Sequence, residues 1–246
     1  MMLRRALAVA ALLAAPVGAR AQASVDPRQT GPQLPYARFA ITPFVGFRAP
    51  STGADEHLYF NGETVSTTSV SRERGGAVLG GLEAEYRFAH QWSAVGSYAM
   101  SARGTDVVST NDGSSTESVS EHGSRFSFAK LGVSYRIPDP AVDARRFHPG
   151  GFIVVAPALV RMEREGFNAV NNKALNLGIA ATAPLGASQR LAFQVGIDDY
   201  LTWWDTDKLA AQDAALFTTP TKTAEVDFGS STGNVFVIRL GGSFRF

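Results

Sequence analysis

The feature that most constrains this chain is a set of eight long segments in which apolar and polar residues alternate. Because successive side chains of a strand point to opposite faces, each segment predicts a β-strand with one apolar face. Each is roughly 10 to 14 residues long, more than the ~5–6 usual in soluble proteins and suited to a tilted strand that crosses a bilayer. The eight segments are residues 37–49, 76–88, 91–103, 124–137, 151–162, 173–185, 190–201 and 233–246.

Two of these segments leave their register open. The fifth has apolar residues on both faces, and Pro157 within it has no N–H to donate to a strand ladder. In the fourth, Phe126 and Phe128 share the parity of Lys130. Either both rings face the same side as this lysine, or a bulge turns them to the opposite side.

Residues 1–23 have the pattern of an export signal: a basic start, an apolar stretch and a small-x-small cleavage site. We expect cleavage after Ala23, with Ala21 as the second choice. Its removal takes away three arginines and no acid, so the net charge changes from +1 to −2. That balance gives no electrostatic footprint for nucleic acid. The absence of cysteine excludes thiol chemistry and cysteine-ligated metal sites.

The connections between the segments alternate in length. Residues 50–75, 104–123, 163–172 and 201–233 form longer connections, whereas residues 89–90 and 186–189 form short ones and residues 138–150 an intermediate one. Long loops on one rim and short turns on the other are typical of bacterial outer-membrane barrels.

An export signal, eight amphipathic strands and two unlike rims together resemble the small bacterial outer-membrane β-barrels of the OmpA/OmpX type. Members of that class commonly end in a signal read by the barrel-assembly machinery, and Arg239, Gly241, Phe244 and Phe246 occupy its positions here. The resemblance implies an all-β, eight-stranded, antiparallel up-and-down transmembrane barrel over residues 37–246. It also implies an outer-membrane location, contact with outer-membrane lipid, and a leader at 24–36 with both termini in the periplasm.

Aromatic residues are expected near the two membrane–water interfaces, where an amphipathic ring is stable. The predicted interface aromatics are Tyr86, Phe88, Trp92 and Tyr135 near the short-turn rim and Trp203 and Trp204 near the long-loop rim.

The polar faces predict the filling of the lumen. An eight-stranded barrel has an interior just wide enough for side chains, and charges buried there need partners. We expect Glu83 or Glu85 to reach Arg239 across the lumen, in a network that acts as a plug; a gate that moves protons or ions is the alternative. The full predicted network is Glu83, Glu85, Arg87, Lys130, Arg136, Asp198, Arg239 and Arg245.

The remaining motifs favour no catalytic, cofactor or metal site. Ser120, Glu121, His122 and Ser124, with His57 in another loop, superficially resemble the set of a lipid-modifying enzyme, but the stretch 110–124 is typical of a solvated low-complexity loop. Residues 207–217 favour a short helix near the barrel mouth.

The sequence therefore predicts a non-enzymatic, porin-like barrel of the Gram-negative cell envelope with a structural or surface-interaction role and an unknown loop ligand. A narrow channel for small, hydrophobic solutes is the first alternative, and a lipid-modifying enzyme is the second. A soluble exported barrel of the calycin type remains as a non-membrane alternative. It differs in sidedness, because its apolar residues lie inside and its charges outside.

Overall fold

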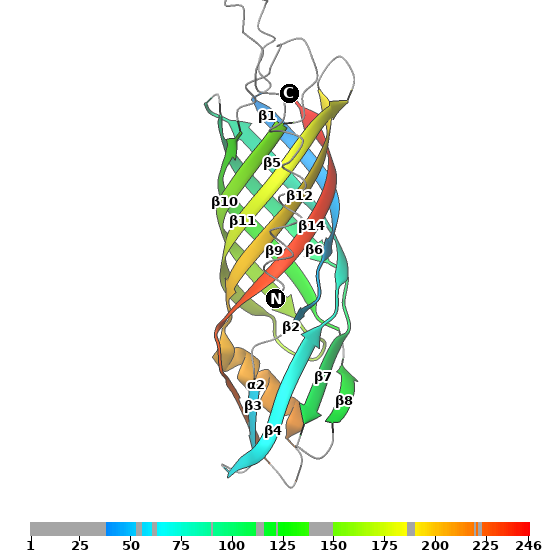
Figure 1. Cartoon of the computed structure of the whole chain (residues 1–246), viewed down its shortest axis with the longest axis vertical. Helices are drawn as coiled ribbons and strands as arrows, with labels where there is room; N and C mark the ends of the chain where they lie inside the picture. The colour runs from blue at the N-terminus through cyan, green and yellow to red at the C-terminus, as the bar shows by residue number, and fades with distance from the viewer. Residues whose placement is uncertain are drawn as a thin grey trace, which may run out of the picture.

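Eight strands close into one antiparallel barrel, as the sequence predicts (Figure 1). The computed structural model describes residues 38–52, 56–60, 63–89, 91–111, 116–121, 123–137, 150–185, 190–218, 220 and 223–246, so the predicted export signal and leader lie outside the described residues. The barrel strands are β1 (Phe39–Arg48), β5 (Ala77–Arg87), β6 (Trp92–Ser101), β9 (Arg125–Arg136), β10 (Gly150–Glu163), β11 (Val170–Leu185), β12 (Leu191–Trp203) and β14 (Thr232–Arg245). β1 pairs with β14 and with β5, which closes the ring.

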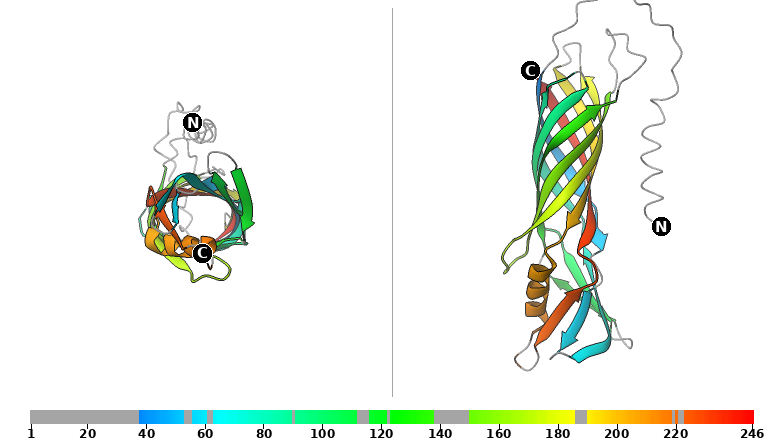
Figure 2. Two further views of the ribbon diagram at one scale, coloured as in Figure 1. Left: turned by 90° about the horizontal axis from the view of Figure 1, so that it is seen from below. Right: turned by 90° about the vertical axis from the view of Figure 1, so that its left-hand side faces the viewer.

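The barrel has two unlike ends. We call the end where β1 begins and β14 ends the basal rim, and the opposite end the apical rim. Beyond the apical rim the chain continues into a second, open sheet (Figures 1 and 2). Its strands are β2 (Ser51–Thr52), β3 (Glu56–Phe60), β4 (Glu63–Arg74), β7 (Asp106–Asn111), β8 (Thr116–Glu121) and β13 (Ala224–Phe228).

This apical sheet corrects the sequence-based view of the long connections as loops. The stretch predicted to be a low-complexity loop contributes the end of β7 and all of β8, which pair as a hairpin from Asp106↔Glu121 to Asn111↔Thr116. Glycines allow neighbouring chain segments to pass close to one another where they leave the barrel. A Cβ on Gly123 would lie 1.5 Å from the carbonyl oxygen of Gly104. Backbone hydrogen bonding between neighbouring excursions therefore converts them into one folded extension.

A single described helix, α2 (Thr206–Phe217), lies beside the apical sheet and matches the short helix predicted for residues 207–217 (Figure 1). Asp205 caps its N-terminus, accepting a hydrogen bond from the backbone N–H of Lys208. The side-chain ammonium of Lys208 also hydrogen-bonds this carboxylate and lowers its pKa, which favours the charged form of the cap. Among the described residues, no helix has the length and hydropathy needed to span a membrane.

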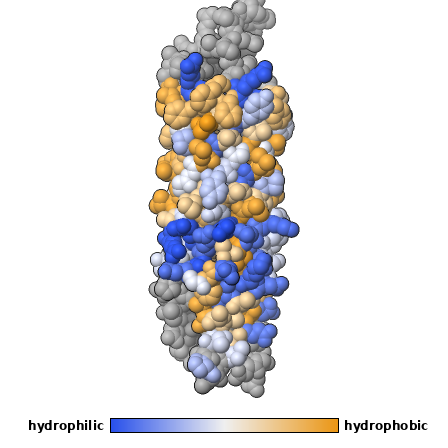
Figure 3. Space-filling model, turned by 180° about the vertical axis from the view of Figure 1, so that it is seen from behind, coloured by the Kyte–Doolittle hydropathy of each residue, from blue (hydrophilic) through white to orange (hydrophobic). Residues whose placement is uncertain are grey.

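The strands place their apolar side chains on the outside of the barrel and their charges inside. Leu131 is 71% exposed and its neighbour Lys130 is 5% exposed, and the same contrast separates Leu240 from Arg239. Figure 3 shows one face of this surface, where apolar residues cover the barrel between more hydrophilic ends. This sidedness is the opposite of the one expected for a soluble calycin-type barrel.

The structure settles both open registers. On β10, Phe152 and Val154 point into the lumen, whereas Ile153 and Val155 are exposed. Pro157 lies within the strand, and the pairing with β9 skips from Val155 to Ala158 at this position, because proline has no N–H to donate.

The fourth predicted strand has no bulge at its two phenylalanines. Phe126 and Phe128 are buried in the lumen, on the same face as Lys130. The lumen is therefore more apolar than the alternating pattern alone predicts.

Candidate functional site

Four buried side chains form a charge network across the middle of the lumen: Glu83, Lys130, Asp198 and Arg239. Arg239 lies 2.8 Å from a carboxylate oxygen of Glu83 and 2.8 Å from one of Asp198. Lys130 lies 2.7 Å from Asp198 and 3.8 Å from Glu83. Each cation thus faces both acids, and the two positive charges balance the two negative ones.

Neutral polar groups complete this network. The amide of Gln194 donates to Glu83 at 3.0 Å, and the ammonium of Lys130 donates to the amide oxygen of Asn176 at 3.1 Å. Buried charges are tolerated when they are paired and hydrogen-bonded. Because the six side chains come from β5, β9, β11, β12 and β14, the network braces strands on several sides of the barrel.

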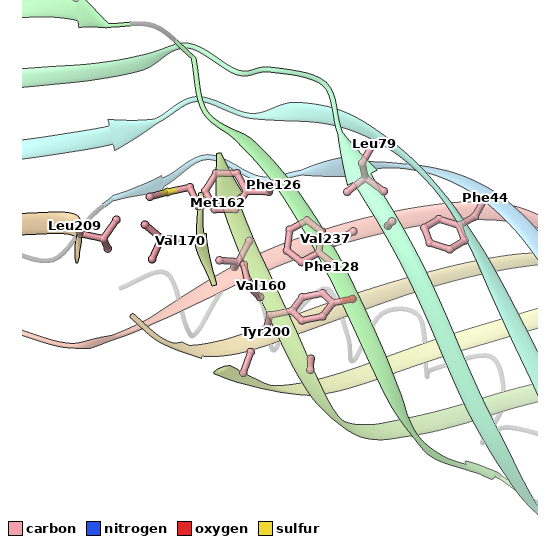
Figure 4. Close-up of a cluster of buried hydrophobic side chains, with 14 residues drawn as sticks. Phe44, Leu79, Phe126, Phe128, Val160, Met162, Val170, Tyr200, Leu209 and Val237 are labelled. Carbon is pink, nitrogen blue, oxygen red and sulfur yellow. The ribbon is translucent and has the colours of Figure 1, made fainter. Parts of the chain in front are cut away.

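Above the charge network, towards the apical rim, the lumen is filled by an outer apolar cluster (Figure 4). Its described members are Phe44, Leu79, Ala99, Phe126, Phe128, Ala158, Val160, Met162, Val170, Ala174, Tyr200, Leu209, Val235 and Val237. Phe128 packs on Tyr200 with ring centroids 4.8 Å apart and on Phe126 at 6.3 Å. These rings form a continuous aromatic line inside the outer half of the barrel.

Arginine side chains cover the apical end of this cluster. The guanidinium of Arg48 lies 4.4 Å from the ring centre of Phe126 and also donates to the carbonyl of Gly75. Arg74 lies 5.1 Å from the ring of Trp204, which in turn meets Phe126 edge-on. Such cation–π contacts let buried arginines pack on aromatic rings.

Trp204 therefore differs from its prediction as an interface aromatic. Its ring turns inward against the outer apolar cluster, whereas Trp203, one residue earlier, is 45% exposed on the outer face. The physical reason is strand alternation, which sends two consecutive tryptophans to opposite sides of β12 and its continuation.

The other predicted interface aromatics lie on the barrel exterior near the basal rim. Tyr86, Phe88 and Trp92 are exposed, and Trp92 packs on the ring of Tyr135 at 4.9 Å between centroids. Their position fits an interfacial belt.

Helix α2 is attached to the apical rim by a buried ion pair. Arg164, which follows β10, pairs with Asp213 of the helix, and both side chains are almost fully buried. Leu209 inserts into the outer apolar cluster, and Gln212 donates to the carbonyl of Asn168 at 2.6 Å. The helix is thus a fixed part of the apical extension.

The structure does not bring all eight predicted lumen charges together. Glu85, Arg87, Arg136 and Arg245 lie at the basal end, half-buried and apart from the charge network. Ser93 donates to Glu85 at 2.6 Å, and Arg245 donates to the hydroxyl of Thr182 at 3.4 Å. Of the two acids considered as partners of Arg239, the structure selects Glu83.

The residues of the predicted assembly signal occupy both faces of β14. Phe244 and Phe246 are exposed on the outer face, and Arg239 belongs to the charge network. At Gly241 an added Cβ would lie 2.7 Å from the carbonyl oxygen of Pro43, so β1 leaves room only for glycine there. The backbone N–H of Phe246 still donates to Phe39 at 2.8 Å.

The residues that superficially resembled an enzyme site receive no support as a group. Ser120 belongs to β8 and His57 to β3, whereas His122 lies outside the described residues. Ala21 and Ala23 of the expected cleavage site also lie outside them. Within the described part of the chain, no three His, Cys, Asp or Glu side chains gather as metal ligands would.

Sequence reasoning missed the Arg164–Asp213 pair and the arginines stacked on Phe126 and Trp204. Arg48, Arg74 and Arg164 stand at strand ends or in connections, where charged residues are normally solvated. Arg48 is buried against Phe126, Arg74 against Trp204 and Arg164 against Asp213, all distant in sequence, so no local pattern could single them out.

The comparison with one solved structure supports the fold. The chain resembles the outer membrane protein OprG from Pseudomonas aeruginosa with 15% sequence identity and a TM-score of 0.52, covering 86% of this chain and 97% of OprG. The attachment invasion locus protein Ail of Yersinia pestis also matches, at 13% identity and a TM-score of 0.37, covering 84% of this chain and 98% of Ail. No protein-family model and no curated protein matches the sequence. The chain thus has the fold of an eight-stranded outer-membrane barrel.

Proposed function

We propose that this chain is an integral outer-membrane barrel whose lumen is closed by side chains and whose apical extension is its interaction surface. The observation that carries the proposal is the inverted sidedness: apolar residues cover the outside of all eight strands, while Glu83, Lys130, Asp198 and Arg239 are buried inside. An apolar exterior of this kind is stable in lipid, and closure of the sheet satisfies every strand edge there. The basal rim then faces the periplasm and the apical sheet the cell exterior.

Two layers of packing support a lumen without an open pore. The charge network crosses its middle, and the outer apolar cluster, with Phe128 and Val160 at most 1% exposed, fills its apical half. Passage of an ion would require breaking ion pairs of 2.7–2.8 Å. What remains accessible is the apical extension, which supports a structural or surface-interaction role without catalysis.

A narrow path for small apolar solutes is the second candidate function. The aromatic line from Phe126 through Phe128 to Tyr200 favours it, because apolar side chains would line the outer half of such a path. This path would end at the charge network. A solute would there have to leave the barrel or displace the side chains of the network.

One experiment separates the two functions. We expect the refolded chain to give no steady conductance steps in planar bilayers and no uptake of a small uncharged aromatic solute into liposomes. Uptake that is lost in Phe128→Trp, where a larger ring blocks the aromatic line, would favour the apolar path. Regular conductance steps would contradict the closed lumen. Heat-modifiable migration on gels serves as the control for folding.

The proposal includes the C-terminal assembly signal. We expect a chain that lacks Phe246 to be synthesised at a normal level but to reach the outer membrane in much smaller amounts, because the exposed terminal ring contributes to recognition by the assembly machinery. Fractionation and heat-modifiable migration measure this. A matched Phe39→Ala variant keeps the terminus while removing the ring that lies 6.4 Å from Phe246. Equal assembly of the deletion variant and the intact chain would contradict the signal.

A further inference from the structure

Three basic side chains that the proposed function does not use lie on the outside of the barrel, at the apical end of its apolar surface. They are Arg125 of β9, Arg161 of β10 and Lys173 of β11. The residue that follows each of them in the chain is buried in the outer apolar cluster, so strand alternation directs the three basic side chains outward. Arg161 and Lys173 are exposed and Arg125 is half-buried. We call these three residues the basic row.

Strand register brings the basic row together. Arg161 pairs with Ser127 of β9 on one side and with Asn171 of β11 on the other. Arg125 and Lys173 each lie two residues from these partners, so both are diagonal neighbours of Arg161 on the same face, within reach of long side chains. Because the strands are tilted, this diagonal follows the circumference of the barrel and keeps the three residues near one level along its axis.

The surroundings of the basic row match a membrane–water interface. Lys173 pairs with the exposed Leu159 on one side and with Trp203 on the other, and tryptophan is a residue that gathers at such interfaces. Lysine and arginine on the lipid face of a barrel are costly at the bilayer midplane and cost little near the interfaces. A hydrophilic band also borders the apolar surface at the apical end on the face shown in Figure 3.

The basic row carries more positive charge than its surroundings neutralise. Glu163, on the same face of β10, has its carboxylate 2.9 Å from the guanidinium of Arg161. Within the part of the chain that the structure describes, neither Arg125 nor Lys173 forms an ion pair. The Nε of Arg125 is buried and has no hydrogen-bond partner among these residues. Two positive charges of the row therefore remain for a partner from outside the chain.

The charge and the position of the row together select the phosphate group of a lipid. Guanidinium and ammonium groups donate charge-assisted hydrogen bonds to phosphate oxygens, and basic residues beside a membrane surface attract anionic head groups. On the midplane side of the row, Leu159 and Leu177 are exposed on the same outer face, where acyl chains would contact them. A free anion would use none of this apolar surface.

We propose that the basic row binds the phosphate-bearing head group of a lipid in the outer leaflet. Arg161 and Lys173 contact the phosphate, Arg125 completes the site, and the exposed leucines beside the row contact the acyl chains of the same molecule. Glu163 competes with the phosphate for Arg161 and limits the affinity. The inference rests on the proposed membrane orientation and adds to it a lipid selectivity on the side of the barrel formed by β9, β10 and β11.

Quenching of Trp203 by brominated lipids tests the site, because this ring lies beside Lys173 on the outer face. The full chain, with Trp92→Phe and Trp204→Phe so that Trp203 is the reporter, is refolded into phosphatidylcholine vesicles that contain a minor fraction of phosphatidic acid. Either lipid is supplied with brominated chains. We expect phosphatidic acid to be enriched at Trp203 over its share of the bilayer.

Variants of the row should change this preference in opposite directions. Arg161→Gln and Lys173→Gln should each lower it by about fivefold, the effect expected for one basic side chain near an anionic lipid surface. Glu163→Gln should raise it, because the competing carboxylate is removed. Arg190→Gln is the matched control, since it removes an exposed arginine at the basal rim and should leave the preference unchanged.

The possible failures can be told apart. Quenching by both lipids in proportion to their amounts, or an equal loss of preference in Arg190→Gln, would overturn the site while leaving the membrane orientation intact. Absence of quenching by either lipid would contradict the orientation and the site with it. Loss of the preference on adding inorganic phosphate at constant ionic strength would indicate a free-anion site and overturn the lipid assignment. If a row variant fails to fold by heat-modifiable migration, Glu163→Gln decides: an unchanged or weaker preference refutes the site.

Discussion

Replacement of Arg239 by methionine should lower the free energy of unfolding by about 3–5 kcal/mol, the range found when one partner of a buried ion pair is removed. Arg239 contacts both Glu83 and Asp198 at 2.8 Å, so its loss leaves Lys130 as the one cation of the network facing two buried carboxylates. Methionine keeps much of the volume of the side chain, so the charge is the main change. Equilibrium unfolding by urea in lipid vesicles measures the effect.

The double variant Glu83→Gln/Arg239→Met should be more stable than Arg239→Met alone. It restores the balance of charge, since Lys130 and Asp198 remain paired at 2.7 Å. With the single variant Glu83→Gln also measured, the double-mutant cycle gives the coupling energy between the two positions. Arg161→Met is the control, because this arginine is half-exposed on the outer end of β10 and should change stability little. A double variant less stable than Arg239→Met would contradict the network.

The second large effect is expected at Leu131, on the outer face of the barrel. Leu131→Arg should cost about 2–4 kcal/mol in lipid vesicles, because a guanidinium near the bilayer midplane loses its water. Leu131 lies in the middle of β9 and is 71% exposed, so the change creates no clash inside the lumen. Unfolding in vesicles again provides the measurement.

Leu131→Ala is the matched control, and it should cost far less because it introduces no charge. The penalty of Leu131→Arg should also fall in short-chain detergent, where water reaches the barrel surface more easily. An arginine variant as stable as the alanine variant in vesicles would place this face outside the hydrocarbon and refute the membrane orientation of the barrel.

The alternating pattern predicted the eight strands closely, because every barrel strand has one face in the lumen. The predicted 76–88 and 190–201 correspond to β5 and β12 within a few residues. The orientation of β10 was harder to predict. The face that contains Phe152 and the face that contains Ile153 are both apolar, so periodicity cannot say which one lies in the lumen. The lumen face of β10 is apolar because its apical residues belong to the outer apolar cluster, whereas Phe152, Val154 and Ala156 pack in a second buried cluster with Val95 and Ala180. These contacts join residues that are distant in sequence.

The candidate sites were predictable as sets of residues, but their grouping was not. Parity placed Glu83, Glu85, Arg239 and Arg245 on one face, yet could not show that Glu83 joins the charge network while Glu85 lies at the basal end of the lumen and accepts a hydrogen bond from Ser93. That division depends on the stagger of the strands around the closed barrel, which brings Ala40 between Glu85 and Arg245. Side-chain parity carries no information about how far along the barrel axis a side chain lies.

The sequence by itself determined the architecture: period-two alternation over strands this long leaves a closed barrel as the arrangement that buries every strand edge. Only the tertiary structure decided how the lumen is divided and that the long connections fold into an apical sheet with α2 attached through Arg164 and Asp213. The physical reason is that alternation is a local property of one strand. Ion pairing, aromatic packing and loop pairing depend on the register between strands that are far apart in the chain.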